Sequence, residues 1–153
     1  MKGRTSMVVA LIGESCTGKT TIAEELKGRT EAEIFAGKDY LRMGKSPSAA
    51  EKSFKEYLEQ NQGQEKMIVY LISEIDELKF LPSHAVKIRC QAPLEIIKER
   101  FAERMRGNLP PQVADMLERK YGMFQETVVD LSYDTTQRDV GQICEKILKY
   151  CHR

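Results

Sequence analysis

The feature that most constrains this chain of 153 residues is a glycine-bounded loop near its N-terminal end. An apolar run at positions 8–12 precedes the loop and is typical of a buried strand, and the segment 21–27 that follows it favours a helix. The loop itself, residues 13–20, fits the pattern G-x-x-x-x-G-K-[ST]. Because this pattern binds phosphate groups when it lies between a strand and a helix, the sequence predicts a phosphate-binding loop here.

The positions of this motif have separate physical roles. Glycine lets the backbone turn tightly and brings its N–H groups close to phosphate oxygens. The helix that follows directs its unpaired N–H groups and its positive dipole end toward the same anion. Lys19 supplies a mobile charge for the β- and γ-phosphates, and the Thr20 hydroxyl suits Mg²⁺, which prefers oxygen ligands. The candidate nucleotide-binding residues here are Gly13, Glu14, Ser15, Cys16, Thr17, Gly18, Lys19, Thr20 and Thr21.

The balance of charge argues against a general affinity for nucleic acid or membranes. The chain has 24 basic and 23 acidic residues, a formal net charge of +1, and no apolar run near the roughly 20 residues that span a bilayer. A hydrophobic fraction of 41% indicates a folded protein, and the length suits one domain rather than two. The four cysteines show neither close pairing nor metal-ligand spacing, so we expect a cytoplasmic protein with reduced thiols.

Strand-like and helix-like segments alternate along the chain. This alternation predicts an α/β fold in which a parallel sheet of five strands carries helices on both faces and right-handed crossovers. The predicted strands are 8–12, 32–37, 67–72, 84–90 and 128–133. The predicted helices are 21–27, 38–43, 48–60, 93–105, 111 to about 125, and 138–150.

Local signals place the ends of three of these helices. Gly28 is a C-terminal stop signal for the first. Ser48 and Glu51 match a capping box at the start of the third, and Pro93 suits the first helical position of the fourth.

Three candidate features follow the ends of predicted strands: the phosphate loop, Asp39 and Glu74. In a parallel sheet, ligands bind beyond the carboxyl ends of the strands. We therefore expect these features to converge on one cleft.

On these features the chain resembles the small P-loop kinases of nucleoside monophosphates and other metabolites, over nearly its whole length. Besides the phosphate loop, the segment 37–42, G-K-D-Y-L-R, looks like the T-G-D-x-L-R segment of adenylate kinases. The resemblance implies that Asp39 lies near the metal and the path of the phosphoryl group, and that Arg42 grips the acceptor's phosphate. It also implies a three-layer P-loop NTPase fold with ATP and Mg²⁺ as cofactors.

A cluster of arginines before a Gly/Pro-rich break is similar to the arginine-bearing lid of these kinases. The resemblance assigns Arg104 and Arg106 to the transferring phosphate, with Arg100 as a further candidate. Phosphoryl transfer needs positioning and neutralisation of charge, and a guanidinium group fits phosphate oxygens two at a time. The expected organisation is a single domain with an acceptor-binding helical segment at about 38–62 and a short lid at about 100–112.

The D-G-F-P-R segment that follows the third strand in adenylate kinases is absent, and S-E-I-D at 73–76 stands in its place. We therefore assign Glu74 to the metal site beside Thr20, with Asp76 as second choice. The resemblance also implies that the loop after the fifth strand packs over the adenine ring, where Arg138 could stack on the base. Tyr40 is a candidate for lining the acceptor pocket.

The sequence thus leads to the hypothesis of an ATP-dependent phosphotransferase whose acceptor is a nucleoside monophosphate or a nucleoside-like molecule. Two alternatives stay open: a kinase of a metabolite alcohol, similar to shikimate and gluconate kinases, and a nucleotide-binding regulatory protein with little transfer activity. A phosphate acceptor is already ionised, whereas for an alcohol Asp39 is the candidate general base. The expected partner is the small-molecule acceptor, bound by a monomer or a homodimer.

Overall fold

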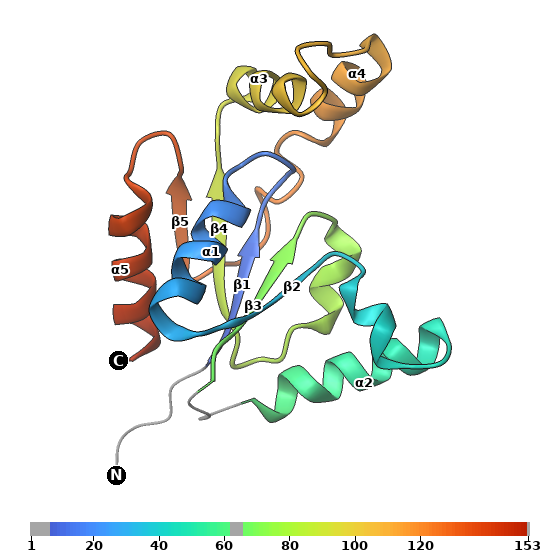
Figure 1. Ribbon diagram of the computed structural model, residues 1–153, viewed down its shortest axis with the longest axis vertical. Helices are drawn as coiled ribbons and strands as arrows, with labels where there is room; N and C mark the ends of the chain where they lie inside the picture. Colours follow the sequence, from blue (N-terminus) through green and yellow to red (C-terminus); the bar gives the residue numbers. More distant parts are fainter. Residues whose placement is uncertain (1–6, 62–65, 153) are drawn as a thin grey trace.

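The computed structural model describes residues 7–61 and 66–152, which form a parallel sheet flanked by helices (Figure 1). Within these residues the sheet has five strands in the order β2-β3-β1-β4-β5. The central strand β1 pairs with β3 and β4, so that Val9 lies opposite both Val69 and Val86. The strands are β1 (Val8–Ile12), β2 (Glu33–Ala36), β3 (Ile68–Ile72), β4 (Val86–Gln91) and β5 (Leu131–Asp134).

Helices cover both faces of the sheet and one of its ends. In Figure 1, α1 and α5 pack on one face, α2 lies toward the other, and α3 and α4 stand beyond the carboxyl ends of the strands. The α-helices are α1 (Lys19–Thr30), α2 (Pro47–Gln60), α3 (Leu94–Arg104), α4 (Pro111–Lys120) and α5 (Val140–Cys151). Two 3₁₀ helices, η1 (Asp39–Met43) and η2 (Ile75–Phe80), follow β2 and β3.

The two faces of β1 contribute side chains to two separate hydrophobic clusters. Val9 and Leu11 pack with buried residues of α1 and α5, whereas Val8, Ala10 and Ile12 pack with residues of α2 and η2. A strand covered on both faces needs a continuous apolar sequence, which is what positions 8–12 provide. The structure confirms the predicted α/β fold.

An aromatic cluster fixes α2 and η1 against the second face of the sheet. The ring of Phe54 lies at its centre, with centroids 5.0 Å from Phe35, 5.6 Å from Tyr40, 5.0 Å from Tyr70 and 5.2 Å from Phe80. Tilted and edge-on pairs at these distances add to the stabilisation that comes from burial of apolar area. The cluster therefore holds the described part of the predicted acceptor-binding segment in place. The last position of that segment, 62, lies outside the described residues.

All three of the predicted helix ends differ in the structure. Pro93 is the N-cap of α3, and Leu94 takes the first helical position. α1 continues through Gly28 to Thr30 and ends at Glu31, which takes the left-handed conformation with φ 60° and donates its N–H to the carbonyl oxygen of Lys27. The N-cap of α2 is Ser46, whose side chain accepts the N–H of Ala49. Pro47 is well suited to the first helical position, so the helix starts before Ser48 can act as its cap.

The predicted boundaries between residues 120 and 131 are also wrong. α4 ends at Lys120, and the chain then forms turns. Phe124 in these turns is buried in the hydrophobic cluster on the face of the sheet that α2 and η2 cover. The Arg89 guanidinium holds this return segment by donating hydrogen bonds to the carbonyl oxygens of Phe124 and Thr127, at 3.2 and 2.7 Å. Val128 is 83% exposed, and β5 begins only at Leu131.

The four cysteines, 16, 90, 144 and 151, are buried and carry free thiols. Burial raises the pKa of Cys90 to about 12 and the pKa values of Cys144 and Cys151 to about 11. Among the described helices, none combines the length and the apolar character that crossing a membrane would require.

Phe54→Ala should lower the free energy of unfolding by about 3–5 kcal/mol, because it empties the centre of the aromatic cluster. Urea denaturation followed by circular dichroism measures this change. As a control, Val128→Ala on the exposed return segment should change the free energy by less than about 0.5 kcal/mol. Equal effects of the two substitutions would contradict the central role of Phe54.

Candidate active site

The phosphate loop begins where β1 ends, and Gly13 is the residue that lets it turn. The N–H of Gly13 donates to the carbonyl oxygen of Ile72 at 3.0 Å. A Cβ atom at this position would lie 2.4 Å from the carbonyl oxygen of Cys90, so a larger residue would displace β4. At the other end of the loop, Gly18 is the N-cap of α1 and has φ +95°, a conformation that favours glycine.

Lys19 begins α1, and its ammonium group lies within the loop. Nζ donates hydrogen bonds to the carbonyl oxygens of Gly13 and Glu14, at 2.5 and 2.8 Å. The residue is only 6% exposed, and desolvation lowers the pKa of its amine to about 8. An anion at this position would bring a full opposite charge to the ammonium in a weakly polar environment, where charges attract strongly.

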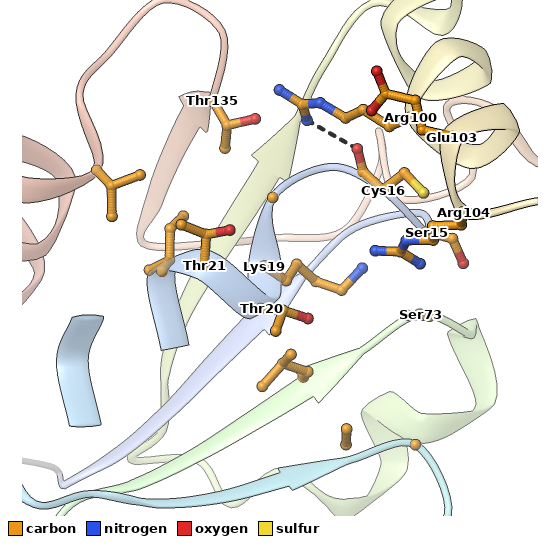
Figure 2. Close-up of a pocket in the computed structure, with 16 residues that line it drawn as sticks. Ser15, Cys16, Lys19, Thr20, Thr21, Ser73, Arg100, Glu103, Arg104 and Thr135 are labelled. Carbon is orange, nitrogen blue, oxygen red and sulfur yellow. Dashed lines mark hydrogen bonds between the residues drawn. The ribbon is translucent and has the colours of Figure 1, made fainter. Parts of the chain in front are cut away.

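Hydrogen bonds from distant parts of the chain hold the loop in shape. Inside the loop, the Thr17 hydroxyl donates to the carbonyl oxygen of Glu14 at 2.7 Å. The Thr135 hydroxyl, just after β5, donates to the carbonyl oxygen of Thr17 at 2.7 Å. Arg100 of α3 donates from Nη1 to the carbonyl oxygen of Cys16 at 2.9 Å (Figure 2). The loop is therefore tied to both β5 and the predicted lid.

A cleft of about 650 Å³ opens over the loop between α1, the ends of β2 and β3, and α3. Figure 2 shows the side chains of Lys19 and Thr20 directed into it, with Arg100 and Arg104 on the opposite wall. One ammonium and two guanidinium groups thus line a common space above the loop. The residues that line it include Ser15, Cys16, Gly18, Lys19, Thr20, Thr21, Gly37, Ser73, Arg100, Glu103, Arg104 and Thr135.

The cleft suits a magnesium ion that arrives with a polyphosphate. Among the described residues, no group of three or more His, Cys, Asp or Glu side chains could hold a metal ion by itself. Thr20 presents an exposed hydroxyl at the start of α1. Mg²⁺ commonly takes one or two protein ligands and fills its other positions with phosphate oxygens and water, so this donor set fits the ion.

Other predicted residues of the acceptor side lie outside the lining of this cleft. The Asp39 carboxylate accepts the N–H of Ala36 at 2.9 Å. Tyr40 packs in the aromatic cluster. The guanidinium carbon of Arg42 lies 4.9 Å from the centre of the Phe35 ring, and the residue is exposed.

The remaining predicted residues are also dispersed. The Glu74 carboxylate lies 2.7 Å from Lys120 Nζ, and Asp76 pairs with Lys79 at 3.3 Å. Arg106 is exposed, has φ 63°, and does not line the cleft. Arg138 lies over Tyr133 at 5.9 Å from the ring centre. The structure thus brings Lys19, Thr20, Thr21 and Arg104 together at the cleft. Among the predicted residues that do not line it are Asp39, Arg42, Glu74, Arg106 and Arg138.

Two contacts of the loop were not predicted from the sequence. The Glu14 carboxylate accepts the N–H of Gly122, and the Thr135 hydroxyl reaches Thr17. These pairs are 108 and 118 positions apart in the chain, and no local pattern signals either of them.

Comparison with known proteins supports the fold. A scan against models of protein families finds no match, and neither does a search of curated proteins. Among solved structures, a gluconokinase from Sinorhizobium meliloti 1021 matches with TM-score 0.61 and 13% identity, over 94% of this chain and 90% of that chain. The YorR protein from Bacillus subtilis, solved in complex with phosphorylated GDP, matches with TM-score 0.63 and 19% identity, over 93% and 94%.

A shikimate kinase from Acinetobacter baumannii, solved in complex with shikimate, matches with TM-score 0.59 and 14% identity, over 93% of this chain and 90% of that chain. At such identities the likeness concerns the fold. The chain therefore has the fold of the small P-loop kinases over nearly its whole length, as the resemblance of its motifs predicted.

The affinity for a nucleoside triphosphate should fall as the pH rises through 8. Phosphate attracts the protonated amine of Lys19, whose pKa of about 8 leaves roughly a tenth of it charged at pH 9. Binding should weaken roughly tenfold between pH 7 and 9, and it should take up a proton near pH 8. Calorimetry in two buffers of different ionisation enthalpy measures both; constant affinity without proton uptake would count against the buried ammonium.

Proposed function

We propose that this protein is a phosphotransferase that moves the γ-phosphate of ATP, bound with Mg²⁺, to a small acceptor. The observation that carries the proposal is the meeting of the phosphate loop, the buried Lys19 ammonium and the Arg100 and Arg104 side chains on one cleft. Phosphoryl transfer depends on positioning and on neutralising charge, and these groups supply both.

In this proposal the triphosphate lies along the loop, where backbone N–H groups and Lys19 hold its oxygens. The Thr20 hydroxyl would hold a Mg²⁺ ion bound with the nucleotide, and that ion would supply positive charge against the phosphate oxygens. Arg104 of α3 stands across the cleft and neutralises charge on the transferring group. Gly107, with φ +88°, follows α3 and gives the lid a flexible point at which to close and exclude water.

Two classes of acceptor enter this proposal. The first is a nucleoside monophosphate or a nucleoside-like molecule, docked between the helices at 38–62 and the sheet, with Arg42 on its phosphate. The second is a metabolite alcohol, and the gluconokinase and shikimate kinase structures that share the fold support it. A nucleoside monophosphate presents a phosphate to the nucleotide, whereas an alcohol of the second class presents a hydroxyl, so the two can be separated by experiment.

Lys19→Ala should abolish ATP binding and phosphoryl transfer, because it removes the ammonium from the centre of the loop. Isothermal titration with ATP and Mg²⁺, and transfer of label from γ-labelled ATP, measure the two losses. Lys27→Ala is the matched control, since Lys27 is an exposed lysine on the same helix. ATP binding by Lys19→Ala at the level of the control would refute the proposed nucleotide site.

Arg42→Ala tests the first class of acceptor. If a nucleoside monophosphate is used, losing a charged hydrogen bond to its phosphate should lower kcat/KM by about tenfold or more. Steady-state kinetics with each accepted monophosphate gives this ratio. Unchanged kcat/KM values with all of them would remove Arg42 as an anchor for the acceptor.

A further inference from the structure

A second, smaller cavity adjoins the nucleotide cleft. It has a volume of about 130 Å³ and lies between the phosphate loop, the end of β3, and helices α3 and α4. Ser15 and Ser73 line both spaces. An acceptor must touch the terminal phosphate of a nucleotide held on the loop, and the two shared lining residues place this cavity next to the cleft.

The walls that α3 and α4 contribute to this cavity are apolar. Ile97 and Phe101 come from α3, and Met116 and Leu117 come from α4. Ile97 is 1% exposed and Leu117 is 5% exposed, so the apolar surface is part of a packed cluster rather than an accidental patch. Such walls favour a ligand with a hydrocarbon body.

The polar walls of the cavity carry a negative charge. They include two carboxylates, Glu14 and Glu74, and one ammonium group, that of Lys120. The ammonium is already paired with the Glu74 carboxylate at 2.7 Å, and the Glu14 carboxylate accepts the N–H of Gly122. Arginine is absent from the described lining. The phosphate or carboxylate group of an anionic acceptor would therefore meet like charge here, whereas a hydroxyl or an ammonium group would find hydrogen-bond acceptors.

The position predicted for an anionic acceptor lacks the corresponding features. The Arg42 guanidinium packs over the Phe35 ring at 4.9 Å, and the Asp39 carboxylate caps the N–H of Ala36. Neither residue lines the cleft or the smaller cavity. The cavity next to the loop is thus the better candidate for the acceptor, and its chemistry differs from what a nucleoside monophosphate needs.

We propose that the acceptor is a small uncharged or cationic alcohol with an apolar body, and that it binds in the cavity between Ser15, Ser73, Glu74 and the facing sides of α3 and α4. This proposal rests on the proposed phosphotransferase activity. The hydroxyl oxygen of the alcohol forms a bond to the γ-phosphorus, and the bond from that phosphorus to the β–γ bridging oxygen breaks. ADP leaves with the bonding electron pair, and the hydroxyl proton passes to water.

The test uses the whole protein with γ-labelled ATP, Mg²⁺ and acceptors that differ in charge and in the size of the apolar body. The four hydroxyl compounds are 2-amino-4-methylpentan-1-ol, 4-methylpentan-1-ol, 2-hydroxy-4-methylpentanoate and 2-aminoethanol, with AMP as the monophosphate. Transfer should be fastest to the first two. The hydroxy acid and AMP should react at least about tenfold more slowly because of their charge, and 2-aminoethanol because it lacks the apolar body.

Glu74→Gln tests the assigned wall, with Glu99→Gln, an exposed carboxylate of α3 outside both cavities, as the matched control. Removing the charge of Glu74 should lower kcat/KM for the amino alcohol by about tenfold relative to the uncharged alcohol, and the control should preserve the ratio. A uniform loss with all acceptors would instead point to the predicted metal role of Glu74 and would overturn its role toward the acceptor.

The remaining outcomes separate this proposal from the activity on which it rests. Preferred transfer to AMP or to the hydroxy acid would overturn the acceptor class while leaving the phosphotransferase standing. Nucleotide binding without transfer to any of the alcohols would also overturn the acceptor class. Failure of the protein to bind ATP with Mg²⁺ at all would overturn the proposed function itself.

Discussion

A buried ammonium group at the start of α1 determines how the rest of the site is built. Moving a charged group out of water costs several kcal/mol unless polar groups face it. The carbonyl oxygens of Gly13 and Glu14 face Lys19, and they do so because the loop turns back over the first residues of α1. That turn requires the absence of a side chain at Gly13, where β4 passes closely, and the left-handed backbone of Gly18. Lys19, Gly13, Gly18 and the neighbouring strand β4 are therefore all needed for this turn and for the buried ammonium within it.

The loop is also a junction of segments that are far apart in the chain. Arg100 contacts it from α3, Thr135 from the turn after β5, and Gly122 from the turns after α4. A parallel sheet makes this possible, because every strand ends at the same edge and every crossover begins there. A ligand on the loop would thus lie next to segments that follow β4 and β5 as well as β1.

The parts of the molecule that follow from local sequence were predictable. β1, the phosphate loop and α1 are adjacent in the chain, and their motif and periodicity carry the prediction without help from the rest of the fold. The prediction for the segment 121–128 is wrong because distant contacts set its conformation. Phe124 packs in the cluster on the α2 face of the sheet, and the Arg89 guanidinium donates hydrogen bonds to carbonyl oxygens 35 and 38 positions further along the chain. The cleft was expected at the strand ends, but the small acidic cavity depends on the tertiary placement of α3 and α4 over Glu14 and Glu74. The roles assigned to the candidate site residues stay predictions, which holds for Lys19, Thr20, Glu74 and Arg104 as well as for Asp39, Tyr40, Arg42, Arg106 and Arg138.

The burial of the four thiols has a consequence for following the protein in solution. The thiolate is the reactive form of cysteine, and burial both hides these sulfur atoms and raises the pKa of each. An alkylating reagent therefore gains access only when the surrounding segment opens. Cys16 lies in the phosphate loop, Cys90 in the central sheet, and Cys144 and Cys151 toward the two ends of α5. Their separate alkylation rates would serve as natural probes of local opening in these regions, without any introduced label.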